Sequence, residues 1–183
     1  MQRISRIEEA TASEKTTVLL TAVRRQMGGV PNIIATMARS SAALAGYLEL
    51  SGALAGGCFS AAEREQIALA VAGANGCDYC ASAHTAVGGM TGLKPGELSL
   101  NLTGQSENSR VAAVLRFVTR IVTTRGRVSD DDLQMARKSG LSEEEIVETI
   151  ALTVLNIFTN YLNHIADTDI DFPLVRTDDA AAA

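Results

Sequence analysis

The sequence predicts an all-α fold, and three observations support this prediction. Aromatic residues make up only 4% of the 183 residues, whereas alanine, leucine and glutamate, which favour helices, are frequent. Alternation of apolar and polar residues is rare, so strand patterns are weak. Helix-start and helix-stop signals divide the chain into helices that we expect at residues 13–27, 31–55, 60–74, 77–89, 94–101, 107–124, 130–138 and 142–166.

Most of these helices begin at a recognisable N-terminal signal. Ser129 precedes three aspartates and predicts an N-cap, and Pro31 and Pro95 fit the first turn of a helix. The capping-box pattern, a Ser or Thr followed three residues later by Glu, occurs at Thr11 to Glu14, Ser60 to Glu63 and Ser142 to Glu145.

Glycines mark most of the expected helix ends, which favours short turns between the helices. The helix at 31–55 is the least regular, because Gly46 and Gly52 interrupt it. The helix at 107–124 has an ordinary amphipathic stripe, whereas the long C-terminal helix at 142–166 is apolar on two sides. Such a helix is expected at the centre of a core or between subunits.

The composition also restricts the organisation and the partners of the chain. We expect one domain over residues 1–176 and a disordered tail at 177–183. The net charge is −5 without a basic block, which argues against nucleic acid as a partner. No stretch approaches the about 18–20 apolar residues of a membrane span, and no signal peptide is recognisable, so we expect a cytoplasmic protein. Many alanines and glycines favour close helix packing and a homo-oligomer.

The segment from residue 75 to residue 84 carries the groups that suggest chemistry. Cys77, Cys80 and His84 recur at i, i+3 and i+7, a spacing that places them on one face of a helix. Glu65 lies twelve residues before Cys77, on the preceding predicted helix. We expect Asn75-Gly76 to break the two helices, so that Cys77 lies in a first turn that lowers its pKa.

These four groups could form a thiol redox centre with a proton relay. Cys80 is one turn further from the helix end than Cys77 and needs another source of activation. His84 is four residues after Cys80 and can take its proton, while Glu65 can orient or charge the imidazole.

The pattern also has other interpretations. A zinc site would use both thiols and His84, with a fourth ligand from Cys58, Glu65 or His164. Haem attachment would need His at the position of Ala81, and a thioredoxin-like site would need a βαβ context. The two cysteines could also be buried apolar residues, which is our interpretation of Cys58.

At this point the residues resemble a known family. The blocks at 65–71, 75–80 and 83–84 are similar to the core of the AhpD-like alkylhydroperoxidases of the carboxymuconolactone decarboxylase superfamily. The blocks at 163–166 and 169–173 resemble its peroxidase-related branch. One position departs from the best-known pattern, which has His between the two cysteines where this chain has Tyr79.

The resemblance implies an AhpD-like helical domain, with a helix-turn-helix redox core and a long C-terminal helix. It implies that Cys80 is the peroxidatic cysteine, that Cys77 resolves it, and that Glu65 and His84 relay protons. The redox-active disulfide Cys77–Cys80 would replace any cofactor or metal. Decarboxylases of the superfamily generally lack the cysteine pair, so the resemblance favours reduction of alkyl hydroperoxides. A lipoyl protein or a thioredoxin-like protein would be the reductant, and the chain would form trimers or hexamers.

Other classes of function remain open on the sequence alone. The chain could be a thiol–disulfide oxidoreductase or a redox sensor that turns over peroxide poorly. It could also be a non-redox, decarboxylase-type enzyme or a metal-bound helical scaffold.

Overall fold

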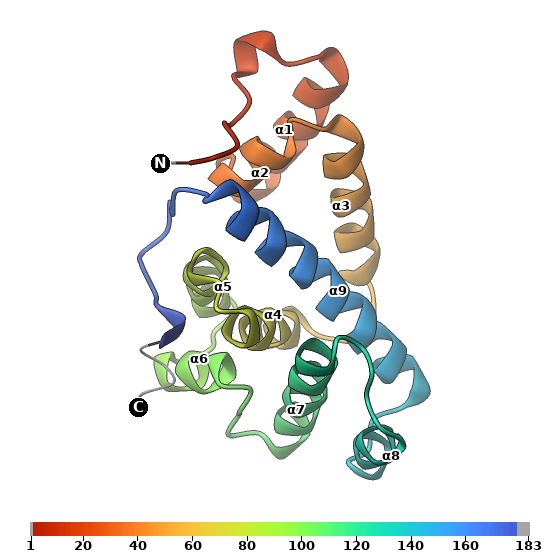
Figure 1. Cartoon of the computed structure of the whole chain (residues 1–183). Helices are drawn as coiled ribbons and strands as arrows, with labels where there is room; N and C mark the ends of the chain where they lie inside the picture. Colours follow the sequence, from red (N-terminus) through yellow and green to blue (C-terminus); the bar gives the residue numbers. More distant parts are fainter. Residues whose placement is uncertain (1, 179–183) are drawn as a thin grey trace.

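The computed structural model describes residues 2–178, which contain only helices and connecting segments, without a strand (Figure 1). The all-α prediction is confirmed. No helix in the described part of the chain is both long and apolar enough to cross a membrane. A short 3₁₀ helix at Glu9–Thr11 is followed by α1 (Glu14–Met27), α2 (Asn32–Met37), α3 (Ser41–Leu54), α4 (Ala61–Asn75), α5 (Asp78–Met90), α6 (Pro95–Leu102), α7 (Ser109–Thr124), α8 (Asp130–Lys138) and α9 (Glu143–Ala166).

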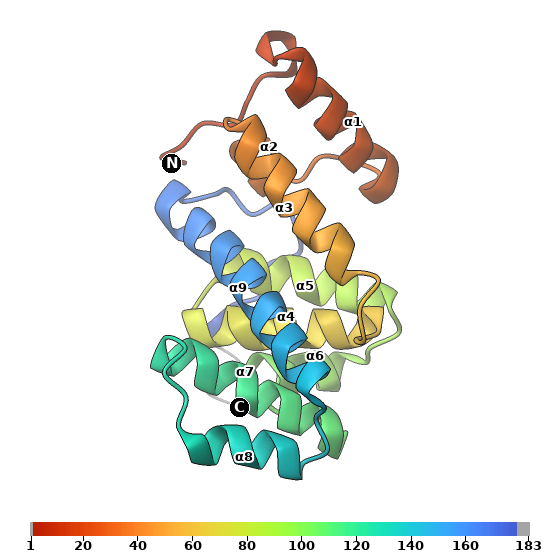
Figure 2. The same ribbon diagram turned by 90° about the vertical axis from the view of Figure 1, so that its right-hand side faces the viewer.

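Helix α4 lies at the centre of the molecule and packs against α5, α6, α7 and α9. Seven consecutive residues, from Gln66 to Ala72, are buried, so every side of the helix faces protein. Alanine at three of these seven positions allows neighbouring helices to approach closely. Figure 2 shows α1 at one end of the molecule and α8 at the other, with α9 running diagonally between them.

The N-terminal signals are largely confirmed. Ser60, Ser129 and Ser142 each cap a helix with a reciprocal capping box, and Pro95 occupies the first turn of α6. The capping box at Thr11 to Glu14 was wrong, because Ser13 is the N-cap of α1 and accepts from the backbone N–H of Thr16.

The single helix expected at 31–55 is wrong, because the chain forms two helices there. Neither predicted interruption, Gly46 or Gly52, breaks the helix. The first helix ends in a tight turn, in which the backbone N–H of Ser40 donates to the carbonyl of Met37 over 3.0 Å. Ser40 then caps α3 by accepting from the N–H of Ala43, and Pro31 caps α2 rather than lying in its first turn.

Helix α9 has its polar side inside and an apolar side outside. Its buried positions include three threonines and three asparagines, which we call the inner face of α9: Thr149, Thr153, Asn156, Thr159, Asn160 and Asn163. Its exposed large apolar side chains, which we call the outer face of α9, are Val147, Ile150, Val154, Phe158, Tyr161 and Ile165. The two apolar stripes recognised in the sequence therefore lie partly on the surface of the monomer.

The close approach of α4 and α6 gives a test of this packing. A Cβ atom added at Gly73 would lie 1.8 Å from the backbone carbonyl oxygen of Leu102. We expect Gly73→Ala to lower the free energy of unfolding by about 1–3 kcal/mol, because a backbone atom cannot rotate away. Urea unfolding followed by circular dichroism measures the change.

Gly52→Ala is the matched control. Gly52 is an exposed residue within α3, and an added Cβ would meet nothing within 4 Å. The substitution should stabilise the protein by up to about 1 kcal/mol through the higher helix propensity of alanine. Equal effects of the two substitutions would contradict the packing of α4 on α6.

Candidate active site

The site begins at the sharp turn between α4 and α5. Gly76 adopts a left-handed conformation with φ of 65°, which favours glycine. The N–H of Gly76 donates to the carbonyl of Gly73 over 3.2 Å, and the N–H of Cys77 donates to that of Ala72 over 2.9 Å. This Schellman motif ends α4 and delivers Cys77 directly to the start of α5.

The two motif thiols lie side by side in the interior. Cys77 is 1% and Cys80 2% exposed, and both are free thiols. Cys77 is the N-cap of α5 rather than a residue of its first turn, with φ of −100° and ψ of 93° outside the helical region. The backbone of Cys77 thus lies outside the helical region, although its carbonyl accepts the N–H of Ala81 on α5 over 2.9 Å.

Glu65 and His84 form the ion pair that the sequence suggested. The Nδ1 atom of His84, on α5, lies 2.8 Å from Oε2 of Glu65, on α4. The His84 side chain is 25% exposed and that of Glu65 is 18% exposed, so the pair lies at the edge of the interior. Burial alone would lower the pKa of His84, but the charge and the hydrogen bond of Glu65, together with the charge of Cys77, raise it. A protonated imidazole is thus favoured beside the thiols.

The two thiols share their protons unequally. The hydrogen bond from the Cys80 thiol lowers the pKa of Cys77 despite burial, helped by the Cys80 backbone N–H and the charge of His84. The same thiol–thiol bond, together with burial, raises the pKa of Cys80 well above its ordinary value. In the resting reduced pair, the negative charge therefore prefers Cys77, and the Cys80 thiol donates to it.

Asparagines of the inner face of α9 lie next to the thiols. The Nδ2 atom of Asn163 lies 3.2 Å from Sγ of Cys80. One turn earlier, Oδ1 of Asn160 accepts a hydrogen bond of 3.0 Å from Nδ2 of Asn75, the last residue of α4. Asn156, Asn160 and Asn163 recur along this helix in the sequence, but no local pattern indicates which of them contacts a thiol.

A residue that the sequence did not indicate also lies near the pair. Tyr47 on α3 packs against the apolar cluster that contains Cys77 and Cys80, with its ring 6.4 Å from that of Phe158. Burial, followed by the charges of Cys80 and Glu65, raises the pKa of Tyr47 to about 12. Its phenol is consequently neutral at ordinary pH.

Tyr79, between the two cysteines, faces away from the proton relay. Its hydroxyl donates to Oδ1 of Asp171 over 2.7 Å and accepts from the backbone N–H of Ile33 over 3.2 Å. Its ring makes a T-shaped contact with Phe172, at 5.8 Å between centroids. Tyr79 is therefore an anchor for the chain after α9.

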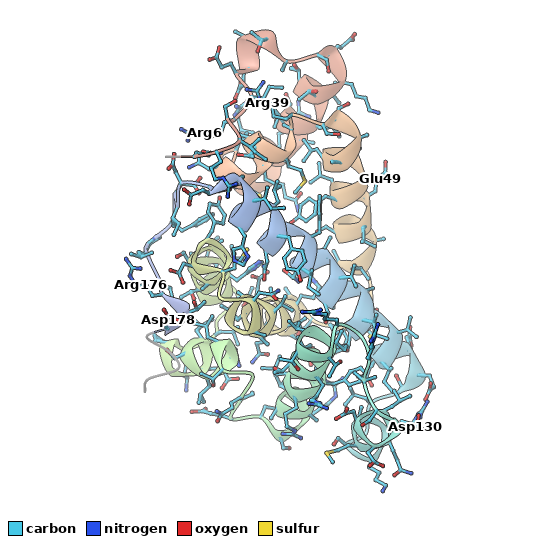
Figure 3. The ribbon with its side chains drawn as sticks, viewed as in Figure 1. Arg6, Arg39, Glu49, Asp130, Arg176 and Asp178 are labelled. Carbon is cyan, nitrogen blue, oxygen red and sulfur yellow. The ribbon has the colours of Figure 1, made fainter. Side chains whose placement is uncertain are left out.

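This anchored stretch, residues 168–177, is called the C-terminal segment here. Figure 3 shows Arg176 and Asp178 at its end, beside α5 and α6. Val175 donates its N–H to the hydroxyl of Ser82 over 2.9 Å, and Thr177 donates both its N–H and its hydroxyl to Asp78 over 2.9 Å. Thr177, the first residue of the tail expected to be disordered, is thus held on α5, and residues 179–183 of that tail lie outside the described residues.

The remaining candidates lie away from the pair. The interpretation of Cys58 as a buried packing residue was wrong, because Cys58 is exposed and its N–H donates to Glu148. His164 is also exposed. In the part of the chain that the structure describes, no three His, Cys, Asp or Glu side chains are placed to hold a metal ion, so the ligands of the zinc interpretation are not brought together.

Comparison of the chain with known proteins finds one matching family profile. The profile of the carboxymuconolactone decarboxylase family matches residues 41–123, which run from α3 into α7 and contain all four site residues. No curated protein sequence matches the chain.

Solved structures extend the similarity to nearly the whole chain. A peroxidase-related protein of Ralstonia eutropha JMP134, described as an alkylhydroperoxidase AhpD core, is 23% identical over 93% of this chain and 92% of its own, with a TM-score of 0.83. A peroxidase-related protein of Silicibacter sp. TM1040 is 20% identical over 92% of each chain, with a TM-score of 0.78. The debrominase Bmp8, in a cysteine-to-alanine variant bound to 2,3,4-tribromopyrrole, is 17% identical over 98% of this chain and 95% of its own, also with a TM-score of 0.78. At these identities, the structures establish the fold.

The ion pair of Glu65 and His84 gives a prediction about protonation. Burial lowers the pKa of His84 and the charge of Glu65 raises it, so Glu65→Gln should lower the pKa of His84. Imidazole NMR over a pH series measures this pKa. Because the pKa of His84 is raised in the folded state, the stabilising contribution of the pair is fully present below 6.5 and is lost as the pH rises through the raised value. The free energy of unfolding should therefore fall by roughly 1 kcal/mol in Glu65→Gln at acidic pH, and by less at alkaline pH.

Glu63→Gln is the control for this prediction. Glu63 lies two residues earlier on α4, and its carboxylate contacts Arg110 over 2.6 Å instead of His84. An unchanged His84 titration in Glu65→Gln, or an equal shift in Glu63→Gln, would show that Glu65 does not set the imidazole charge.

Proposed function

We propose that this chain, whose residues 41–123 match the carboxymuconolactone decarboxylase family, is an AhpD-like, thiol-dependent peroxidase that reduces alkyl hydroperoxides. One observation carries the proposal. The two thiols of Cys77 and Cys80 are buried together at the junction of α4 and α5, beside the ion pair of Glu65 and His84. Nucleophile, resolving thiol and proton donor therefore occur in a single cluster.

The first step oxidises Cys80. The Cys80 proton passes to the neighbouring Cys77 thiolate, and the Cys80 thiolate attacks the terminal oxygen of R–O–O–H. The O–O bond breaks, an S–O bond forms, and the products are Cys80 sulfenic acid and the alkoxide RO⁻. Protonated His84, held by Glu65, gives its proton to the alkoxide and releases the alcohol.

The second step forms the disulfide. The Cys77 sulfur attacks the sulfenyl sulfur of Cys80, and the departing hydroxide leaves as water with the Cys77 proton. Two electrons from two thiols thus reduce one peroxide to an alcohol and water. Because Cys77 is an N-cap with non-helical dihedral angles, its sulfur can approach Cys80 with little unwinding of α5.

An external dithiol closes the cycle. Thiol–disulfide exchange would return the pair to the reduced state, with a lipoyl domain or a thioredoxin-like protein as the source of electrons. Since both sulfurs are at most 2% exposed, the reductant needs a long, narrow dithiol arm or a local opening of the site. A reducing cytoplasm would supply such a partner.

Reductive debromination is a second candidate, favoured by the similarity to the debrominase Bmp8 over 98% of this chain. The same residues could carry it: the Cys80 thiolate would attack bromine, and the carbanion would take a proton to give R–H. Cys77 would then displace bromide and form the disulfide. Hydroperoxide and bromopyrrole as alternative substrates distinguish the two activities.

We also propose that the chain forms a homo-oligomer, trimeric or hexameric, through the outer face of α9. This face presents six large apolar side chains at helical spacing along most of a 24-residue helix. Contiguous apolar patches of this kind mark interaction sites on soluble proteins. A second copy of the same face could bury them.

Thiol titration tests the peroxidase proposal. Reduced wild type contains three cysteines, and one equivalent of cumene hydroperoxide should consume two thiols and leave Cys58. Cys77→Ser should stop at a sulfenic acid that dimedone traps, because no resolving thiol remains. Cys80→Ser should react at least 100-fold more slowly in stopped-flow measurements, because the proposed nucleophile is absent.

Cys58→Ser serves as the control and should keep the wild-type rate. Loss of no thiol in wild type would exclude the peroxidase proposal and direct the same assay to 2,3,4-tribromopyrrole. A Cys80→Ser variant as fast as wild type would reverse the assignment of the two cysteines.

Light scattering after size-exclusion chromatography tests the assembly. The double substitution Ile150→Glu and Val154→Glu introduces two charges into the outer face of α9 and should reduce the measured mass to that of one chain. Val18→Glu is the matched control, since Val18 is an apolar residue of α1 that is 63% exposed, and it should leave the assembly intact. The assignment of this face fails if wild type is monomeric or if the α9 double variant keeps the wild-type mass.

A further inference from the structure

Two buried amides next to Cys80 each have an atom without a hydrogen-bond partner. Asn160 is 0% and Asn163 is 4% exposed. In the described part of the chain, Nδ2 of Asn160 and Oδ1 of Asn163 are both buried and unpaired. Buried polar atoms are paired in the great majority of cases, so each exception requires an explanation.

The orientation of the Asn160 amide is fixed by Asn75. Oδ1 of Asn160 accepts from Nδ2 of Asn75 over 3.0 Å, so this end of the amide is occupied. The amino group is consequently left free, one helical turn before the Asn163 amide that contacts Cys80, and its proximity lowers the pKa of Cys80 against the larger opposing effects of Cys77 and burial. Asn75 lies two residues before Cys77, so the turn that ends α4 also fixes the orientation of the Asn160 amide.

Asn163 supplies the second donor. Its Nδ2 atom is 3.2 Å from Sγ of Cys80, and its amide also lowers the pKa of Cys77. Because Asn163 serves both sulfurs, it stabilises negative charge on the pair without choosing between them.

The remaining groups around the thiols favour charge on Cys77. The Cys80 thiol, the Cys80 backbone N–H and the charge of His84 all lower the pKa of Cys77. The other titratable groups near Cys80 are Tyr47 on α3, whose pKa is about 12, and Tyr79 on α5, whose pKa is raised further. Neither phenol offers a positive charge, and burial with the charge of Cys77 opposes ionisation of Cys80.

We propose that Asn160 and Asn163 form a two-amide site for negative charge on the Cys80 sulfur, and that Asn160, positioned by Asn75, makes Cys80 rather than Cys77 the attacking sulfur. The choice of substrate rests on the function proposed above, but the stabilisation of the thiolate does not. Charge-assisted hydrogen bonds from amides are strong in the interior, where water does not compete.

The unpaired oxygen of Asn163 can accept a hydrogen bond from the oxidised form of Cys80. When the Cys80 thiolate breaks the O–O bond of a hydroperoxide, the hydroxyl that remains on sulfur carries an O–H donor. Oδ1 of Asn163 is the buried acceptor that is free beside that sulfur. The amide that held the thiolate therefore also receives the sulfenic acid until Cys77 attacks.

The test measures the pKa of Cys80 directly. In a protein that carries Cys58→Ser and Cys77→Ser, Cys80 is the only thiol, and the ultraviolet absorbance of its thiolate is titrated with pH. Asn160→Leu and the isosteric Asn160→Asp should each raise the pKa of Cys80 by about one to two units, since a hydrogen bond to a charged group is lost. Asn75→Ala should shift it in the same direction, because the Asn160 amide can then rotate.

Asn156→Leu is the matched control. Asn156 lies on the same face of α9, 8% exposed, but its Nδ2 donates to the carbonyl of Leu152 and not to a thiol. Its substitution should leave the pKa of Cys80 unchanged. Thermal unfolding of every variant identifies any that has lost its fold, and the isosteric Asn160→Asp is the one least affected by packing.

Limiting iodoacetamide tests the choice of sulfur. In Cys58→Ser protein with both motif thiols, mass spectrometry gives the ratio of labelled Cys80 to labelled Cys77. Asn160→Leu should lower this ratio about tenfold, which corresponds to one pKa unit. An unchanged Cys80 pKa and an unchanged labelling ratio in both Asn160 variants would overturn the inference. If hydroperoxide consumes no thiol while the pKa shift is present, the proposed peroxidase function fails and the amide site remains.

Discussion

The left-handed glycine at the end of α4 is the constraint on which the rest of the site depends. Gly76 lets the chain reverse within one residue, so Cys77 caps α5 while its own N–H closes α4. Gly76 itself is exposed, but Cys77 turns inward and packs in the apolar cluster that contains Leu69 and Ala72 of α4. The same reversal sets α5 against α4, which brings His84 to Glu65 across the two helices. One backbone conformation thus fixes both the location of the thiols and that of the ion pair of Glu65 and His84.

Helix α9 buries polar side chains, and each of these needs a hydrogen-bond partner inside the protein. Two threonines of the inner face return their hydroxyls to the helix itself: Thr153 donates to the carbonyl of Thr149 over 2.7 Å, and Thr159 donates to that of Asn156 over 2.9 Å. Asparagines cannot all do so, and Asn160 and Asn163 reach Asn75 and Cys80 instead. The cost of burying these amides is therefore offset near the thiols, where a polar partner is available. The outer face keeps its large apolar side chains exposed on the surface of the chain.

Local signals in the sequence predicted the features that local interactions determine. The N-caps Ser60, Ser129 and Ser142, the break at Asn75-Gly76 and the pairing of Glu65 with His84 follow from residues close to one another or from helical spacing. The break before Ser40 was hidden, because Gly46 and Gly52 gave the stronger but misleading signal. The contact of Asn163 with Cys80 spans 83 residues of sequence, and that of Tyr79 with Asp171 spans 92. Such contacts are fixed by tertiary packing, so no local pattern could assign these residues their roles.

The C-terminal segment is held by the two residues that lie between the cysteines, which restricts the substitutions that homologues can accept there. Asp78 and Tyr79, the two residues enclosed by the cysteines, hold Thr177 and Asp171. Asp171 in turn accepts from the backbone N–H of Asn32 over 2.8 Å, so three distant stretches of chain meet at one carboxylate. A substitution at position 79 therefore alters the docking of the chain end before it alters the sulfurs. Among homologues, residue 79 should covary with residue 171 rather than with residue 84.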